Sequence, residues 1–339
     1  MQPQAQYPVQ SAPKPHRAGK SIVVLLIVAL FVAGGYWAYA NQDRIVDDII
    51  GLSYDPSPEV AQLVEQLELT DDGMRIMKAS SPVVQTAGDF NENCPSVDTS
   101  TSVLGCYWNH NLYVYAVDNA ELDGVKENTM AHELLHAVWD RYKHPEIAAE
   151  LEKVYAQNQE ELGGHMEHYS EESRVDELHS IIGTQLPDNK LTDRLREHYA
   201  KYFKNRAKIV QYYLDYESKF KETERRLAEL REQIDAGSTE INRLIANYES
   251  STNQLNADIN TFNKRARSGY YTSSAQFSAD REKLVARQNQ LESDYDYIDQ
   301  KIDETNALIE EYNQNVDHST ELYQSINSQI TAPSQALGE

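Results

Sequence analysis

The sequence predicts a mainly helical chain of the α+β class, in which a short β-sheet accompanies many helices. Residues 131–139 are apolar on almost every side, which is typical of a helix in a protein core. Residues 111–118 (NLYVYAVD) are rich in Tyr and Val, which predicts a strand just before that helix. The last third of the chain follows a heptad pattern, which predicts long coiled-coil helices.

The charge of the chain excludes nucleic acid as a partner. The 339 residues carry a net charge of −23, and the sequence pI is about 4.8. Phosphate binding needs a basic surface, which such a chain does not offer. The mean hydropathy of −0.65 indicates that most residues are solvated. The length leaves room for two or three domains.

The N-terminal residues predict a tail and a membrane anchor. Residues 1–20 lack periodicity and are expected to be a disordered cytoplasmic tail. Residues 21–40 are apolar and uncharged, long enough to cross a bilayer at about 1.5 Å per helical residue. Lys14, Arg17 and Lys20 precede this run, so we expect a single-pass protein whose remainder is exported. A cleaved signal peptide is the alternative.

Cys94 and Cys106 are the only cysteines and predict a disulfide. Two cysteines in an exported domain are usually bridged. Residues 41–58 before them are expected to be a linker, followed by short helices over 60–69 and from about 71 to 77. Two unpaired thiols are the alternative to the disulfide.

His132, Glu133 and His136 form a His-Glu-x-x-His motif inside the apolar helix, with Asn128 and Thr129 as predicted N-caps. Positions i and i+4 share one helix face, so both histidines can reach one metal ion. The glutamate can then act as general base on a bound water, as in zinc hydrolases. The alternative is a core helix whose histidines are satisfied by hydrogen bonds.

The helix predicted at 171–183 is the expected source of a third ligand. A catalytic zinc ion usually has three protein ligands and one open position. Glu172 and Glu177 both flank the apolar stripe of this helix, so periodicity does not choose between them. Either glutamate can instead be a surface charge.

Four segments in the same order resemble a group of membrane-anchored bacterial metallopeptidases of the gluzincin type. They are LTDDG (69–73), LGCY (104–107), AHELLHA (131–137) and DELHSIIGT (176–184). That group has an extracytoplasmic His-Glu-x-x-His domain and a helical C-terminal tail. The match covers most of residues 60–330 and, outside the metal motif, consists of short segments. The resemblance implies a zincin-like domain over 59–202 and a location at the bacterial plasma membrane.

The resemblance also implies the chemistry. It implies a zinc ion bound by the two motif histidines and a glutamate, and a peptide or protein substrate at the cell surface. Glu172 and Asp176 have the Glu-x-x-x-Asp spacing of gluzincins, in which the aspartate orients a histidine. The DELHS core of the fourth segment favours Glu177 instead.

Further roles are expected for residues on either side of the motif. In zincins an edge strand next to the metal-binding helix binds an extended substrate, and Leu112, Val114 and Tyr115 are assigned to that strand. An ordinary sheet strand is the alternative. His179, His198 or Tyr199 can donate a hydrogen bond to the oxyanion of the reaction, or have a structural role.

The C-terminal residues 203–332 predict an antiparallel coiled-coil hairpin, followed by a disordered tail over 333–339. Apolar residues recur at spacings of three and four over 227–262 and 284–330, and a turn-like break at 267–274 separates the two runs. Parallel self-association or a coiled-coil partner is the alternative. A surface interaction protein with a structural or inactive zinc domain is accordingly the rival to the peptidase.

Overall fold

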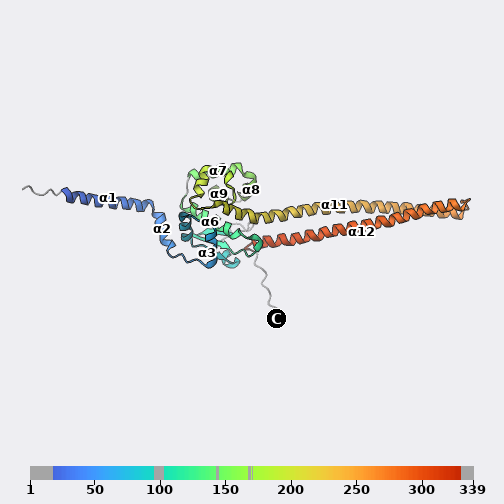
Figure 1. Ribbon diagram of the computed structural model, residues 1–339, viewed down its shortest axis with the longest axis horizontal. Coiled ribbons are helices and arrows are strands. Elements are labelled where there is room, and N and C mark those ends of the chain that lie inside the picture. Colours follow the sequence, from blue (N-terminus) through green and yellow to red (C-terminus); the bar gives the residue numbers. More distant parts are fainter. Residues whose placement is uncertain (1–17, 95–102, 143–144, 167–168, 170, 330–339) are drawn as a thin grey trace, which may run out of the picture.

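The computed structural model describes residues 18–94, 103–142, 145–166, 169 and 171–329. Figure 1 shows a pair of N-terminal helices, a compact body and a long helical hairpin that projects from the body. The N-terminal helices are α1 (Ala18–Ala40) and α2 (Gln42–Gly51). The hairpin consists of α11 (Arg206–Arg267) and α12 (Ser274–Ser325).

The predicted membrane anchor is wrong. Residues 21–40 are helical, as part of α1. A spanning helix must be both long and predominantly apolar, and none of the helices in the described ranges meets both conditions. The prediction followed from one uncharged run in the sequence. The single-pass topology, the plasma-membrane location and the lipid contact of residues 21–40 are corrected with it.

Residues 41–58 are not a simple linker, because they contain α2, which packs on the body. Asp47 of α2 is buried and accepts a hydrogen bond from Arg141 Nε, at 2.9 Å to Oδ1 and 3.2 Å to Oδ2. Burial raises the pKa of Asp47 and outweighs the opposing effect of the Arg141 guanidinium. A buried carboxylate is costly without such a partner, so this ion pair fixes α2 in place.

The body surrounds a three-stranded sheet in the order β1-β3-β2. β1 (Val83–Gln85) runs parallel to β3 (Asn111–Tyr115), and β2 (Gly105–Trp108) runs antiparallel to β3. β3 is therefore central and β2 lies at an edge. The remaining elements are α3 (Pro58–Gln66), α4 (Asp71–Ala79), α5 (Ala87–Asn93), η1 (Ala120–Leu122), α7 (Pro145–Gln157), α8 (Gln159–Met166), η2 (Asp188–Lys190) and α10 (Asp193–Tyr199).

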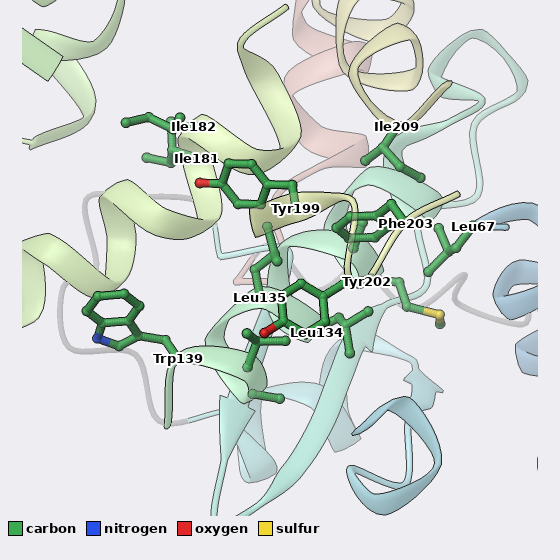
Figure 2. Packing of buried hydrophobic residues seen from close by; sticks show 14 of the residues in the cluster. Leu67, Leu134, Leu135, Trp139, Ile181, Ile182, Tyr199, Tyr202, Phe203 and Ile209 are labelled. Carbon is green, nitrogen blue, oxygen red and sulfur yellow. The ribbon is translucent and has the colours of Figure 1, made fainter. Parts of the chain in front are cut away.

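Helix α6 (Val125–Arg141) lies in the core of the body against α9 (Glu171–Gln185). Leu134 and Leu135 are fully buried, and Figure 2 shows them among side chains from α9, α10 and α11. Gly183 marks a close approach of the two helices, because a Cβ there would clash with the Leu135 side chain and the Tyr199 ring. The core therefore forms around the helix that carries the His-Glu-x-x-His motif.

The predicted hairpin is confirmed, since α11 and α12 pack side by side in opposite directions (Figure 1). Phe220 contacts Tyr323 near the body, with ring centroids 5.0 Å apart, and Phe262 contacts Phe277 at the far end, at 5.1 Å. Gly269, with φ +72°, supplies the turn. Past the end of α12, Ser328 returns to the body, where its carbonyl accepts from Asn91 Nδ2 at 2.7 Å.

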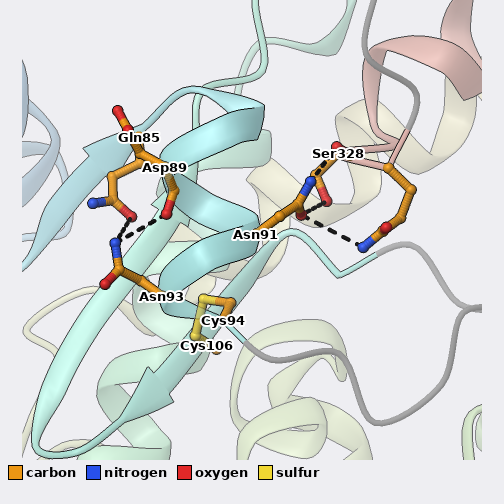
Figure 3. Close-up of a disulfide and its surroundings, with 8 residues drawn as sticks. Gln85, Asp89, Asn91, Asn93, Cys94, Cys106 and Ser328 are labelled. Atoms are coloured by element: carbon orange, nitrogen blue, oxygen red, sulfur yellow. Dashed lines mark hydrogen bonds between the residues drawn. A yellow bond between two sulfur atoms is a disulfide. The ribbon is translucent and has the colours of Figure 1, made fainter.

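The predicted disulfide is also confirmed. Cys94 and Cys106 are bonded, with 12 residues of sequence separation. Figure 3 shows that the bond joins the end of α5 to β2, next to the contact between Asn91 and Ser328. Because β2 pairs with one strand only, this bond is a second attachment that holds the edge strand to the body.

Replacing both cysteines by serine is expected to destabilise the body by about 3 kcal/mol, the loop-closure entropy of a bridge of this span. Thermal unfolding followed by circular dichroism should give a lower Tm for Cys94→Ser/Cys106→Ser than for the unchanged chain. An equal Tm would mean that the bridge contributes nothing to the packing of β2.

Candidate metal centre

The two motif histidines lie one helical turn apart on α6 and face each other. His132 Nε2 and His136 Nε2 are separated by 3.1 Å, and their ring centroids by 4.9 Å. Both side chains are partly accessible, on the side of α6 that is open to a cleft. The helix therefore presents two imidazole nitrogens to one point, as the i, i+4 spacing predicts.

Asn128 and Thr129 are not caps, because α6 begins three residues earlier, at Val125. Asn128 is buried and donates from Nδ2 to the carbonyls of Thr184, at 3.0 Å, and Ile209, at 3.1 Å. These carbonyls belong to α9 and α11. The amide therefore fixes the rotation of α6 relative to both neighbours, and with it the direction of the motif.

Helix α9 brings two carboxylates to the histidines. Glu177 Oε1 lies 3.4 Å from His132 Nε2, and Glu177 Oε2 lies 3.5 Å from His136 Nε2. Asp176 Oδ1 lies 2.8 Å from His136 Nδ1. Of the two glutamates expected as third ligand, Glu177 is placed at the motif, while the side chain of Glu172 lies outside the described residues.

The spacing of the two histidine nitrogens fits a tetrahedral metal ion, and the Glu177 carboxylate faces both of them. Ligand atoms about 2.0–2.1 Å from a tetrahedral zinc ion lie roughly 3.3 Å from one another. The two histidine nitrogens are 3.1 Å apart, which is close to that value. Each of them faces a different oxygen of the Glu177 carboxylate, at 3.4 Å from His132 and 3.5 Å from His136. When the His136 ring is neutral, its Nδ1–H donates a hydrogen bond to Asp176. The lone pair of its Nε2 then points toward His132 and is free to bind a metal ion. The group of His132, Glu133 and His136 could hold a metal ion.

The charges of these buried groups depend on one another. Burial by itself would lower the pKa of His136, but hydrogen bonds to Asp176 and Glu177 raise it well above its usual value. Burial would likewise raise the pKa of Glu177, yet the two histidines hold it far below its usual range. Without a metal ion, Glu177 is therefore an anion that attracts positive charge to this point.

Glu133 lies beside the pair, against the edge strand. It is 5% exposed, and burial raises its pKa, an effect that the two histidines oppose. A Cβ at Gly105 of β2 would lie 2.8 Å from Glu133 Cγ and 2.9 Å from Oε1. The glycine thus lets β2 approach the carboxylate, which a larger residue would displace.

The histidines, Glu133 and Glu177 lie in a cleft of about 860 Å³. One wall is β2, with Gly105 and Tyr107, and another is the start of α11, with Tyr213 and Tyr216. Tyr169, in the connection before α9, also lines the cleft, and its hydroxyl is near the Glu177 carboxylate. Burial, followed by this carboxylate, raises the pKa of Tyr169, so the phenol keeps its proton.

Three residues expected near the reaction lie elsewhere in the fold. His179, His198 and Tyr199 are buried in the core and do not line the cleft. His179 Nε2 and His198 Nε2 are 2.8 Å apart, and the Tyr199 hydroxyl donates to the His179 carbonyl at 2.8 Å. Burial and the neighbouring His198 keep the pKa of His179 far below its usual value. Their observed role is structural, which corrects the assignment as oxyanion donors.

The strand expected to bind substrate is also in a different position. Leu112 and Val114 are fully buried in the central strand β3, which has a neighbour on each side. Tyr115 packs against a second apolar cluster and is not among the residues that line the cleft. β3 is therefore an ordinary strand of the sheet and not the edge strand that was expected to bind substrate. The edge strand next to the motif is β2, whose four residues are too few to show a strand pattern in the sequence.

Comparison with known proteins finds no matching family, no similar curated protein and no similar solved structure. The resemblance to gluzincin-type metallopeptidases therefore stays a prediction from four short segments of the sequence.

Removing the Asp176 carboxylate is expected to weaken zinc binding by about 10- to 100-fold, because that side chain orients His136. Asp140→Ala is the matched control, since Asp140 lies on α6 and lines the same cleft without contacting His136. Competition with a chromophoric chelator measures both affinities. Equal zinc affinity in Asp176→Ala and Asp140→Ala would contradict the orienting role.

Proposed function

We propose that this chain is a zinc-dependent peptidase with the ligand arrangement of gluzincins. The observation that carries the proposal is the convergence of His132, His136 and Glu177 inside a cleft, with the Glu133 carboxylate beside them. Two histidines and one glutamate leave a fourth position of a tetrahedral ion open, as in catalytic rather than structural zinc sites.

The roles of the chain's own residues follow from their positions. A zinc ion held by His132, His136 and Glu177 supplies Lewis-acid polarisation of the scissile carbonyl and lowers the pKa of a bound water to about 7. Glu133 is the general base that takes a proton from the attacking water and passes it to the leaving amine. Its burial raises its pKa, which suits a group that must both accept and return a proton.

The edge strand β2 is the proposed site for the peptide. An extended peptide can add to an exposed sheet edge through backbone hydrogen bonds. Gly105 places the backbone of β2 close to Glu133, so a peptide bound there would lie next to the general base. The tyrosines of α11 form the opposite wall and offer flat surfaces for substrate side chains.

Tyr169 is the proposed donor to the scissile carbonyl oxygen as negative charge builds up on it. Tyr169 lines the same cleft as the histidines, and the Glu177 carboxylate is near enough to raise the pKa of its phenol. With a raised pKa it remains a hydrogen-bond donor at neutral pH. It replaces His179, His198 and Tyr199 in this role, since those three side chains are in the core.

Peptide cleavage tests the proposal directly. The purified full chain, loaded with zinc, is assayed on a mixed peptide library, with and without a chelator. Glu133→Gln is expected to lower cleavage by about 10²- to 10⁴-fold while zinc remains bound, because only the proton transfer is lost. Glu127→Gln, a change of the same kind at a buried glutamate of the same helix, is the control.

Two results would contradict the peptidase. One is cleavage that persists with the chelator, and the other is equal activity in Glu133→Gln and the unchanged chain. Zinc binding without any cleavage would favour the rival function, an interaction protein with a structural metal ion. A fourth protein ligand in a zinc-bound structure would point the same way.

Tyr169→Phe separates a catalytic from a positioning role. A donor to the reacting carbonyl should lower kcat by about 10²-fold and leave zinc affinity unchanged. If the hydroxyl only supports Glu177, zinc affinity falls instead and kcat at saturating zinc is preserved. Steady-state kinetics together with a zinc titration distinguish these outcomes.

A further inference from the structure

One row of apolar side chains along α12 remains at least partly accessible to solvent. It recurs every seven residues and consists of Tyr295, Ile302, Ile309, Val316 and Tyr323. Val316 and Ile309 are 37% and 39% exposed, and Tyr323 and Tyr295 are 46% and 57% exposed. The heptad spacing places all five on one face of the helix. These five residues form the open row.

The row that is buried between the two helices is the less apolar one. Leu291, Ile298 and Thr305 are buried on α12, and a Cβ at Gly237 of α11 would clash with the Thr305 side chain. Gly237 and Thr305 thus lie inside the hairpin beside the apolar Leu291 and Ile298, while isoleucine, valine and tyrosine also remain at its side. Contiguous exposed apolar residues usually mark an interaction surface.

Residues of α11 extend this apolar surface. Tyr248 lies next to Tyr295, with ring centroids 6.2 Å apart, and Phe220 next to Tyr323. This antiparallel register places Leu227, Ile234 and Ile241 of α11 opposite Val316, Ile309 and Ile302 of α12, in that order. All three are partly accessible. The result is a two-helix apolar face about four heptads long, of the kind that other helices cover in a bundle.

The charges of the hairpin change sign along its length. Between residues 259 and 279, around the tip, the only charged residues are Lys264, Arg265 and Arg267. These three are exposed, and no ion pair of theirs occurs among the described residues. Between 288 and 325 the chain has ten acidic residues, and Lys301 is the only lysine or arginine. The tip is thus basic, and α12 on its way to the body is acidic.

We propose that a second copy of this chain covers the open row, with the two hairpins antiparallel in a four-helix bundle. The same face then serves in both copies, as a two-fold axis requires. The antiparallel arrangement sets each basic tip on the acidic part of the other hairpin. It also leaves the two bodies at opposite ends, since each body lies at the base of its hairpin (Figure 1).

A parallel pair would not satisfy these constraints. In a parallel pair the acidic residues 288–325 of the two copies would lie side by side. The two bodies would lie at the same end of the bundle, where they would compete for space. Charge that is complementary along a helix pair selects orientation, and like charges disfavour the wrong one. The proposal does not depend on the metal centre, so it holds or fails independently of the peptidase.

The first test is the mass of the full chain in solution, by size-exclusion chromatography with light scattering. The expected mass is twice the 38.7 kDa of one chain. Ile309→Glu/Val316→Glu is expected to weaken the dimer by at least about 10-fold, because both charges would be buried in the bundle. Ala307→Glu/Gln314→Glu adds the same charges at exposed positions away from the seam and should leave the dimer unchanged.

A second variant leaves both rows intact, so that misfolding of the hairpin cannot explain its effect. Lys264→Glu/Arg265→Glu/Arg267→Glu reverses the charge of the tip only. It is expected to weaken the dimer at low ionic strength, with a smaller effect at high salt, where exposed charges are screened. Far-UV circular dichroism should show the same helix content in all variants.

Fluorescent labels test the direction of pairing. The two natural cysteines are bonded to each other, so Ser274→Cys labels the tip alone and Gln324→Cys labels the base alone. Mixing tip-labelled and base-labelled chains should give energy transfer. Two tip labels should give none, because the tips would lie roughly 78 Å apart, the length of α12.

The proposal would be overturned by a monomeric unchanged chain at micromolar concentration, by equal dimerisation of the two glutamate pairs, or by energy transfer between tips. Retention of the dimer in the tip variant at low salt would also contradict it, because the orientation then would not depend on charge.

Discussion

The packing of α6 against α9 is the constraint on which the metal centre depends. It sets two imidazole nitrogens 3.1 Å apart and places a buried carboxylate against both. Such a group is unfavourable in a protein interior unless positive charge neutralises it. The surrounding fold holds the two helices in that position. Gly183 permits their close contact, and Asn128 fixes the rotation of α6 through carbonyls of α9 and α11.

Long periodic elements could be predicted from the sequence, because each carries its pattern many times. The heptads predicted the hairpin and its turn, and the all-round apolar run predicted the core helix α6. The spacing of the two histidines is set within a single helix, so local geometry suffices to bring them together. The disulfide could be predicted because the chain has only two cysteines.

The remaining contacts depend on tertiary packing, which no local pattern contains. Both Glu172 and Glu177 flank the same apolar stripe, so helical periodicity could not select one. His179 lies two residues beyond Glu177 on a helix that is buried on several sides, so the sequence did not show that it points into the core. Tyr169 lies outside any element, and β2 is too short for alternation. The membrane prediction failed because the apolar run at 21–40 did not correspond to a helix that is both long and apolar enough to cross a membrane.

The contact between Asn91 and Ser328 has a consequence for the order in which parts of the chain fold during synthesis. The two residues are 237 positions apart, yet they are neighbours at the base of the hairpin. The base of the body also includes Leu322, which packs with Val117 and Val125. During synthesis these partners can meet only after the chain has emerged from the ribosome as far as Ser328. The wall of the cleft that α11 forms can fold earlier. The contacts of Leu322 and Ser328 with the body form last, because they need the end of α12 and the residues after it. Ribosome-bound chains that end before α12 would therefore lack these contacts.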